Sequence, residues 1–238
     1  MEEYDETFPE AALHGRINPR TVWKAVYMGN PRVFEQKEKE ECPEFSVDIL
    51  MDASSSRKQM QEQIAAQGCV LAKSLEQCGI PSQIYSYCSI RGYTVMHIFK
   101  GYDEKADADE LFKYVAAGNN RDGLALRAAG YLMEKSPKKR KILLFLTDVS
   151  PQDDVELGEG AFYKNKEYSD MSAVEDTIKE VRALKNQGVF VVGIFMGSAR
   201  SDETAAEIFG QSLVKIKNIS EFSDAVGRVI KDCFSFSS

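Results

Sequence analysis

The stretch FSVDILMDASSS, residues 45–56, joins a buried strand to a polar turn and sets the expectation for the whole fold. Its first part, Phe45–Asp52, is a short and mostly apolar run of strand length. The turn that follows places Asp52, Ser54 and Ser56 at alternate positions, in the pattern D-x-S-x-S. In open α/β sheets, ligands bind beyond the carboxyl ends of the strands. The turn after this strand is therefore a candidate binding site.

Short apolar runs and helical periods alternate after this strand. A helical period covers 57–78, and two apolar runs, 83–90 and Tyr93–Lys100, flank the turn Arg91-Gly92 and predict a hairpin. Further helices are expected at 106–116, 123–135, 172–187, 202–209 and 220–233, and further strands at 141–147 (KILLFLT), 189–196 and 213–216. This order predicts a doubly wound α/β fold, with a mostly parallel six-stranded sheet, helices on both faces and one antiparallel edge strand.

The first 44 residues have a different composition from the rest of the chain. They begin with the acidic run MEEYDE, contain four prolines and end in a charged run at 35–41. We expect 1–44 to be an N-terminal extension that packs on or leads into the domain, with one short helix around 21–27. The domain itself is expected to cover 45–238.

Composition excludes several classes of function. The 238 residues carry a net charge of −7, whereas a nucleic-acid-binding protein needs a concentrated basic face. No apolar run is long enough to span a membrane, and the acidic start lacks the features of a signal peptide, so a cytoplasmic protein is expected. The five cysteines are widely spaced without a C-x-x-C pair, which argues against a disulfide framework and structural zinc.

Two more polar loops are expected at the same edge of the sheet. The strand 141–147 runs into Asp148, and the turn 118–123, which contains Asp122, precedes the helix that leads into this strand. A carboxylate with two hydroxyls makes an all-oxygen site of the kind that Mg²⁺ prefers. Asp52, Ser54 and Ser56 would hold the metal, and Asp122 and Asp148 would complete the shell, directly or through water. The other interpretation is that the first three only cap the next helix; the two further acids favour a metal.

The loops together resemble the metal-ion-dependent adhesion site of von Willebrand factor A domains. By position, Asp52, Ser54 and Ser56 match the first-loop ligands, and Asp148 matches the acid after the fourth strand. The usual second-loop threonine is missing, and the turn Asn120-Arg-Asp122-Gly123 stands in its place. That departure resembles the bacterial subfamily of cobaltochelatase subunits and nitric oxide reductase activation proteins, in which Asp122 would replace the threonine.

The resemblance implies a function as well as a fold. It implies a non-enzymatic protein-interaction module that holds Mg²⁺ (or Mn²⁺ or Ca²⁺) and receives a carboxylate from a protein partner. The partner implied is a MoxR-type AAA+ ATPase, acting in the activation or metal loading of a target enzyme. Members of the subfamily usually carry a long acidic region before this domain, whereas this chain has only a short acidic start. The sequence is compatible with two interpretations of the chain, a fragment of a longer subunit and a stand-alone relative.

An enzyme is the alternative from a different class. Asp52 beside Mg²⁺ could act as the nucleophile of a hydrolase or phosphotransfer enzyme. Phosphatases of that type would have a second acid at the position of Ser54. A nucleotide-binding Rossmann domain is less favoured, because both a G-x-G-x-x-G turn and a Walker lysine motif are missing. Asp153 and Asp154 either shape the rim of the site or only terminate the strand.

Overall fold

The computed structural model describes residues 44–153, 168–197 and 201–235, together with three two-residue strands nearer the N-terminus. The chain divides into two units, Met1–Cys42 and Pro43–Ser238. Strands β1 (Ala11–Ala12), β2 (Arg16–Ile17) and β3 (Phe34–Glu35) of the first unit form an antiparallel sheet in the order β1-β3-β2. The helix expected around 21–27 and the rim candidate Asp154 lie outside the described residues.

A six-stranded sheet forms the centre of the second unit, in the order β6-β5-β4-β7-β8-β9. Its strands are β4 (Phe45–Asp52), β5 (Ser82–Ile90), β6 (Tyr93–Lys100), β7 (Arg140–Thr147), β8 (Val189–Phe195) and β9 (Leu213–Lys215). All neighbouring strands are parallel except β5 and β6, so β6 is an antiparallel edge strand. The predicted fold class is confirmed.

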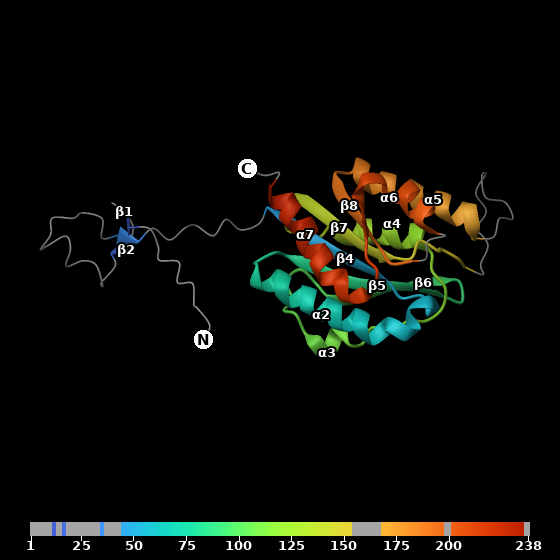
Figure 1. Cartoon of the computed structure of the whole chain (residues 1–238). Coiled ribbons are helices and arrows are strands. Elements are labelled where there is room, and N and C mark those ends of the chain that lie inside the picture. Colours follow the sequence, from blue (N-terminus) through green and yellow to red (C-terminus); the bar gives the residue numbers. More distant parts are fainter. Residues whose placement is uncertain are drawn as a thin grey trace, which may run out of the picture. The chain divides into compact units, whose positions relative to one another are not determined.

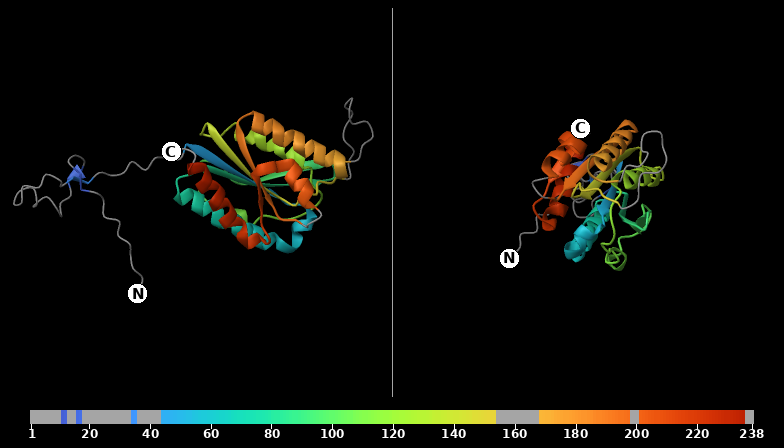
Figure 2. Two further views of the ribbon diagram at one scale, coloured as in Figure 1. Left: turned by 45° about the horizontal axis from the view of Figure 1, so that its top comes forward. Right: turned by 90° about the vertical axis from the view of Figure 1, so that its right-hand side faces the viewer.

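Helices cover both faces of this sheet and make three layers (Figures 1 and 2). On one face lie α2 (Gln61–Gln77), α3 (Ala108–Leu111) and α7 (Phe222–Ser235), and on the other lie α4 (Asp122–Met133), α5 (Asp170–Asn186) and α6 (Asp202–Phe209). Short 3₁₀ turns are η1 (Ser55–Met60), η3 (Gly210–Ser212) and η4 (Ile219–Glu221). Successive side chains of β4 point to opposite faces of the sheet. Ile49 and Met51 therefore belong to the hydrophobic core on the α2 and α7 side, and Leu50 belongs to the core on the α4 and α5 side.

Most elements begin and end within two residues of the predicted bounds, but two predictions were wrong in part. The predicted helix over 57–78 begins as the 3₁₀ turn η1 and becomes α-helical only at Gln61. The predicted helix over 106–116 is shorter, because α3 ends at Leu111. Beyond it, the N–H of Ala117 donates to the carbonyl oxygen of Ala53 at 2.8 Å, so the backbone pairs with the β4 turn instead of with its own helix.

The strand order explains where a ligand site belongs. From β4 the chain crosses to β5 and β6 on one side, then returns to place β7 on the other side of β4. The carboxyl ends of β4 and β7 therefore form the point where the direction of winding reverses, which is where open α/β sheets bind ligands. Asp52 ends β4 and Asp148 directly follows β7.

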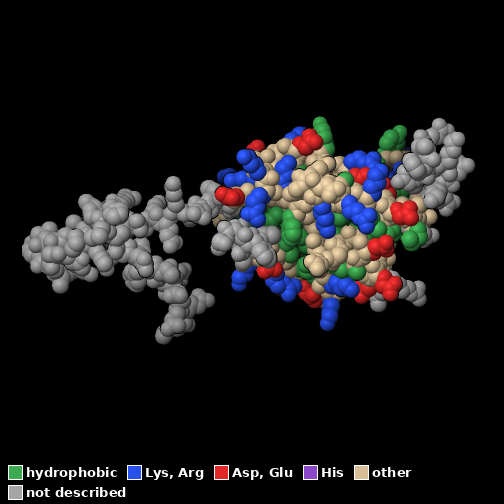
Figure 3. Space-filling model, turned by 90° about the horizontal axis from the view of Figure 1, so that it is seen from above, with side chains coloured by type: hydrophobic (Ala, Val, Ile, Leu, Met, Phe, Trp, Pro, Cys, Tyr) green, Lys and Arg blue, Asp and Glu red, His purple; other side chains and the backbone are tan. Residues whose placement is uncertain are grey.

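Membrane-spanning helices and basic patches are two features that would point to other classes of function. Within the described ranges, no helix is long and apolar enough to cross a bilayer. Figure 3 shows the side of α5 and α6, where lysine and arginine side chains are interspersed with acidic ones. This face does not offer the concentrated positive charge that binds a phosphate backbone.

Candidate metal centre

Asp52 is the innermost acid of the candidate site. Its side chain is fully buried, and its Oδ1 accepts a hydrogen bond from the backbone N–H of Ser54 at 2.8 Å. Its other oxygen, Oδ2, is buried without a hydrogen-bond partner among the described residues. Burial, and next the charge of Asp148, raise the pKa of Asp52 to about 6, with Arg57 acting in the opposite direction. A buried carboxylate oxygen without a hydrogen bond is costly, so it indicates a place for a cation. In this structure Nε of Arg57 lies 3.7 Å from it.

The two serines of the first loop lie between the buried Asp52 and the surface. The hydroxyl oxygens of Ser54 and Ser56 lie 3.0 Å apart, and that of Ser56 donates to Oδ2 of Asp148 at 3.0 Å. Ser54 is buried and Ser56 is exposed. Ser54 precedes η1, yet its side chain makes no capping hydrogen bond. Helix capping therefore does not account for these hydroxyls.

Asp148 stands on a strained turn at the end of β7. The following residue, Val149, has φ 50°, in the left-handed region that β-branched residues avoid. The turn is held because the Val149 N–H donates to Oγ1 of Thr147 at 2.9 Å. Backbone strain of this kind costs on the order of 1–3 kcal/mol and clusters at functional sites. In this turn Asp148 accepts from the Ser56 hydroxyl, and its side chain is 16% exposed.

Asp122, at the start of α4, lies fully buried beneath the site and is already hydrogen-bonded. Its Oδ1 accepts from the Tyr87 hydroxyl at 2.6 Å and from Nδ2 of Asn120 at 3.1 Å, and its Oδ2 accepts from Oγ1 of Thr147 at 3.5 Å. Burial, and next the charge of Asp52, raise the pKa of Asp122 well above its usual value. With two protein donors on Oδ1 and a long contact from Thr147 to Oδ2, Asp122 is already engaged by the protein, and its raised pKa favours the neutral carboxyl in the metal-free site.

Backbone contacts fix the second loop against the first. The carbonyl oxygen of Gly118 accepts from the N–H of Ser55 at 3.0 Å and from its hydroxyl at 2.8 Å. Gly118 has φ +66°, and a Cβ built on it would lie 2.2 Å from the carbonyl oxygen of Ser89, so only glycine fits. The Tyr114 hydroxyl donates to the Asp52 carbonyl oxygen at 2.6 Å and closes the loop from the α3 side.

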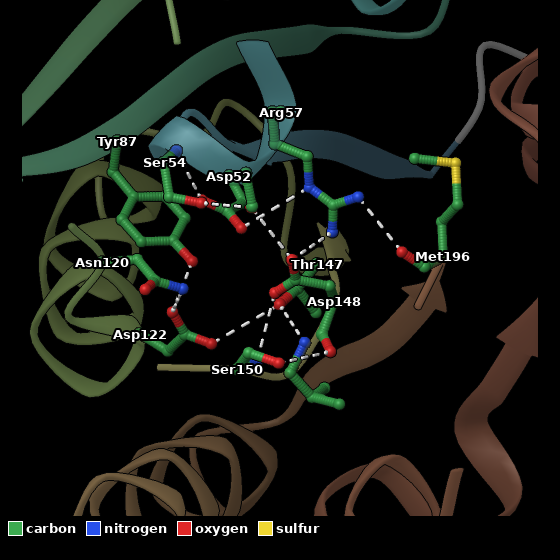
Figure 4. A network of polar contacts seen from close by, with 12 residues as sticks. Asp52, Ser54, Arg57, Tyr87, Asn120, Asp122, Thr147, Asp148, Ser150 and Met196 are labelled. Carbon is green, nitrogen blue, oxygen red and sulfur yellow. Dashed lines mark hydrogen bonds and ion pairs between the residues drawn. The ribbon is translucent and has the colours of Figure 1, made fainter. Parts of the chain in front are cut away.

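Arg57 is the residue of the site that sequence reasoning missed. Its guanidinium is 3% exposed and reaches back into the site from η1 (Figure 4). Nη2 lies 3.2 Å from Oδ2 of Asp148, Nε lies 3.7 Å from Oδ2 of Asp52, and Nη1 donates to the carbonyl oxygen of Met196 at 3.1 Å. A basic residue directly after the D-x-S-x-S pattern was the available signal. Only the 3₁₀ geometry of η1 shows where its side chain points.

The structure thus brings all five predicted metal residues to one edge of the sheet, with unequal roles. Over the described part of the chain, no three carboxylate, imidazole or thiol side chains come close enough to hold a metal by themselves. The donor set depends on the hydroxyls of Ser54 and Ser56 beside Oδ2 of Asp52, which accepts no hydrogen bond among the described residues. All of these donors are oxygens, which fits a hard divalent cation. Of the two rim candidates, Asp153 pairs with Nε of Arg121 at 2.6 Å.

Comparison by sequence does not assign the chain to a family. No family model matches the chain. An uncharacterized protein of Pseudomonas aeruginosa is 27% identical over 124 residues, which make up 50% of this chain and 18% of that protein. The chain therefore spans less than a fifth of the length of this relative, whose name states no activity.

Comparison by structure is more informative about the fold. The von Willebrand factor domain of the pilus tip protein Mfa5 from Porphyromonas gingivalis has a TM-score of 0.53 at 12% identity, covering 79% of this chain and 94% of that one. Proximal thread matrix protein 1 from the mussel byssus, with a zinc-occupied adhesion-site motif, has a TM-score of 0.52 at 16% identity and coverages of 79% and 47%. The manganese-loaded TRAP protein of Plasmodium vivax has a TM-score of 0.52 at 14% identity and coverages of 78% and 73%. The chain has the von Willebrand factor A fold.

Proposed function

We propose that this chain is a non-enzymatic protein-interaction module that depends on a divalent metal at Asp52, Ser54 and Ser56. The observation that carries the proposal is the buried Oδ2 of Asp52, which accepts no hydrogen bond among the described residues, beside two hydroxyl oxygens at the carboxyl edge of the sheet. Asp148 would join from the exposed side, directly or through water, and Asp122 would add negative charge from below. Fold neighbours with zinc and manganese in their metal sites support a divalent cation.

Mg²⁺ is the metal that the donor set favours, with Mn²⁺ or Ca²⁺ as the other candidates. Mg²⁺ is usually bound through one or two carboxylates and keeps several waters. With few protein ligands, the bound cation would supply an exchangeable position that a carboxylate of a protein partner can take. Ser56 and Asp148 stand at the accessible side of the site, so we expect the partner to approach there.

The narrower proposal is that the partner is a MoxR-type AAA+ ATPase and that the pair activates, or loads metal into, a target enzyme. Its support is the resemblance of the turn Asn120-Arg-Asp122-Gly123 to the chelatase and nitric oxide reductase activation subfamily. The buried Asp122 in that turn is consistent with a more negative site than a threonine would give. A cytoplasmic location belongs to the same proposal.

Isothermal titration with Mn²⁺ tests the metal. The wild-type chain should bind one ion, Asp52→Asn should abolish binding, and Ser54→Ala should weaken it by about 10-fold, since one ligand bond is lost. Asp103→Asn is the matched control, because Asp103 is an exposed aspartate on the β6–α3 connection. Equal binding by wild type and Asp52→Asn would place the metal elsewhere.

The partner is tested with a purified MoxR-type ATPase. Complex formation should be seen with Mg²⁺ and be lost both with EDTA and with Asp52→Ala. Binding that is indifferent to both changes would exclude a metal-bridged contact. A phosphatase screen with trapping of an acyl phosphate on Asp52 tests the enzymatic alternative, and a trapped Asp52 phosphate would overturn the non-enzymatic proposal.

A further inference from the structure

We propose that the guanidinium of Arg57 is a built-in counter-ion that competes with the divalent metal for Asp52 and Asp148 and so sets the metal affinity of the site. This inference rests on the proposed function, because it assumes that a metal binds at Asp52. In the metal-free state the guanidinium lies against Asp52 and Asp148. In the metal-bound state the cation takes that place and the guanidinium moves away from both acids.

The position of Arg57 coincides with the oxygens that a metal would need. Its Nε and Nη2 approach Oδ2 of Asp52 and Oδ2 of Asp148 at 3.7 and 3.2 Å, and Figure 4 shows the guanidinium between these two acids and Met196. Oδ2 of Asp52 accepts no hydrogen bond among the described residues, and Oδ2 of Asp148 accepts one from the Ser56 hydroxyl. A divalent cation and a guanidinium have like charge, so they cannot both lie against the same two oxygens without strong repulsion.

The positive charge of Arg57 offsets the negative charge of the neighbouring acids. Three carboxyl groups, Asp52, Asp122 and Asp148, meet at this edge, and each of the first two is fully buried. No other lysine or arginine forms an ion pair with these three acids in the described ranges. Buried acids of like charge repel one another, and a nearby cation stabilises their ionised forms, as the charge of Arg57 does by opposing the rise in the pKa of Asp52. Arg57 supplies this cation from within the chain.

The hydrogen-bond geometry shows that Arg57 fits these acids poorly. Its Nε and Nη2 are buried without hydrogen-bond partners among the described residues, although both lie near carboxylates. Among the described residues, the one hydrogen bond of the guanidinium goes from Nη1 to the carbonyl oxygen of Met196, directly after β8. A bidentate arginine–carboxylate pair would be much stronger. The guanidinium is therefore held by its hydrogen bond to Met196 and not by the acids, so a divalent cation can displace it from the two carboxylates.

The experiment compares Mn²⁺ affinity by isothermal titration for wild type, Arg57→Gln and Arg57→Lys at one ionic strength. Arg57→Gln should bind about 10-fold or more tightly than wild type, since removing one nearby charge from a shielded site is worth at least that factor. Arg57→Lys keeps the charge and should stay within about threefold of wild type. The matched control is Arg182→Gln, on the exposed side of α5.

A measurement on the wild-type chain covers the case in which Arg57→Gln fails to fold. Titrating diamagnetic Mg²⁺ into arginine-labelled protein should shift the Arg57 Nε–H resonance, assigned with Arg57→Lys, and leave that of Arg182 unchanged. Weaker or unchanged metal binding by Arg57→Gln, or an unmoved Arg57 resonance at saturating Mg²⁺, would overturn the inference alone. Failure of both wild type and Arg57→Gln to bind metal would overturn the proposed function with it.

Discussion

Asp122 illustrates how one residue can favour binding at a cost to stability. It is fully buried, beside Asp52 and Asp148, and its oxygens accept from Tyr87, Asn120 and Thr147. Burial and the charge of Asp52 raise its pKa, so the folded chain holds this proton more tightly than the unfolded chain and loses stability as the pH rises. An uncharged amide removes this cost, and it also removes the carboxylate charge that would attract a cation. Stability and metal affinity are expected to move in opposite directions at this position.

Asp122→Asn should therefore unfold at higher urea concentration than wild type in EDTA, and should bind Mn²⁺ more weakly. The amide keeps the shape of the side chain, so packing is preserved. Tyr87→Phe removes the donor instead and should destabilise the chain by about 1–3 kcal/mol, because it leaves a buried acceptor with one partner fewer. If Asp122→Asn is less stable in EDTA and also binds metal as well as wild type, Asp122 has only a structural role.

Asp48, four residues before the site, makes stability depend on pH. Burial raises its pKa from 3.8 to about 7, opposed by hydrogen bonds from the Tyr102 and Tyr85 hydroxyls and by the charge of Lys141. Because the folded state holds the proton more tightly than the unfolded state, the stabilising contribution is complete below about pH 4. It is lost as the pH rises to about 7, at up to about 1.4 kcal/mol per pH unit.

Asp48→Asn should flatten this slope. Urea unfolding of wild type and variant between pH 4.5 and 7.5 is expected to show wild type losing stability relative to the variant as the pH rises. The exposed Asp103→Asn serves as control and should follow the wild-type curve. Parallel curves for wild type and Asp48→Asn would show that the buried carboxyl does not titrate in this range.

At the scale of elements, the contact between the first and second loops determines the shape of the site. Gly118 lies at φ +66° with Ser89 2.2 Å from a built Cβ, whereas Gly79 lies at φ +65° with nothing within 4 Å. The two glycines thus share the backbone conformation and differ in their surroundings. Alanine at either position has the left-handed penalty of about 1–2 kcal/mol, and only alanine at 118 must also displace a strand carbonyl.

Gly118→Ala should therefore cost clearly more stability than Gly79→Ala in urea unfolding. It should also weaken Mn²⁺ binding, since the Gly118 carbonyl oxygen holds both the N–H and the hydroxyl of Ser55. Gly79→Ala, at the far end of α2, should leave binding unchanged. Equal effects of the two substitutions on stability and binding would mean that the loop contact is unimportant.

Elements could be predicted from sequence where the pattern is local. The strand Phe45–Asp52 has the predicted bounds, because its apolar run is bounded by polar residues on both sides. The positions of Ser54, Ser56 and Asp148 follow from being next to strand ends. Arg57 and Tyr87 could not be found this way. The position of the Arg57 side chain depends on η1 being a 3₁₀ turn and not an α-helix. The position of Tyr87 depends on the register between β4 and β5, which pairs Tyr87 of β5 with Asp52 of β4.

At the scale of the whole molecule, the strand order brings distant residues to one edge. Asp52 and Asp148 are 96 positions apart in the chain and become neighbours because β4 pairs with β7 at the switch point. The alternation of strands and helices predicted this sheet, since parallel strands need helical crossovers. The backbone pairing that ends α3 early, between Ala117 and Ala53, is long-range and leaves no trace in the local pattern.

Anomalous diffraction from crystals grown with Mn²⁺ tests most directly the claim that this edge of the sheet holds a divalent cation. The account predicts one strong peak bonded to a carboxylate oxygen of Asp52 and to the hydroxyl oxygens of Ser54 and Ser56, at distances close to the about 2.0–2.1 Å of Mg²⁺ sites. Arg57 should have withdrawn from Asp52 and Asp148 in that crystal. Crystals in saturating Mn²⁺ with the guanidinium still against both acids and no peak beside Asp52 would contradict it.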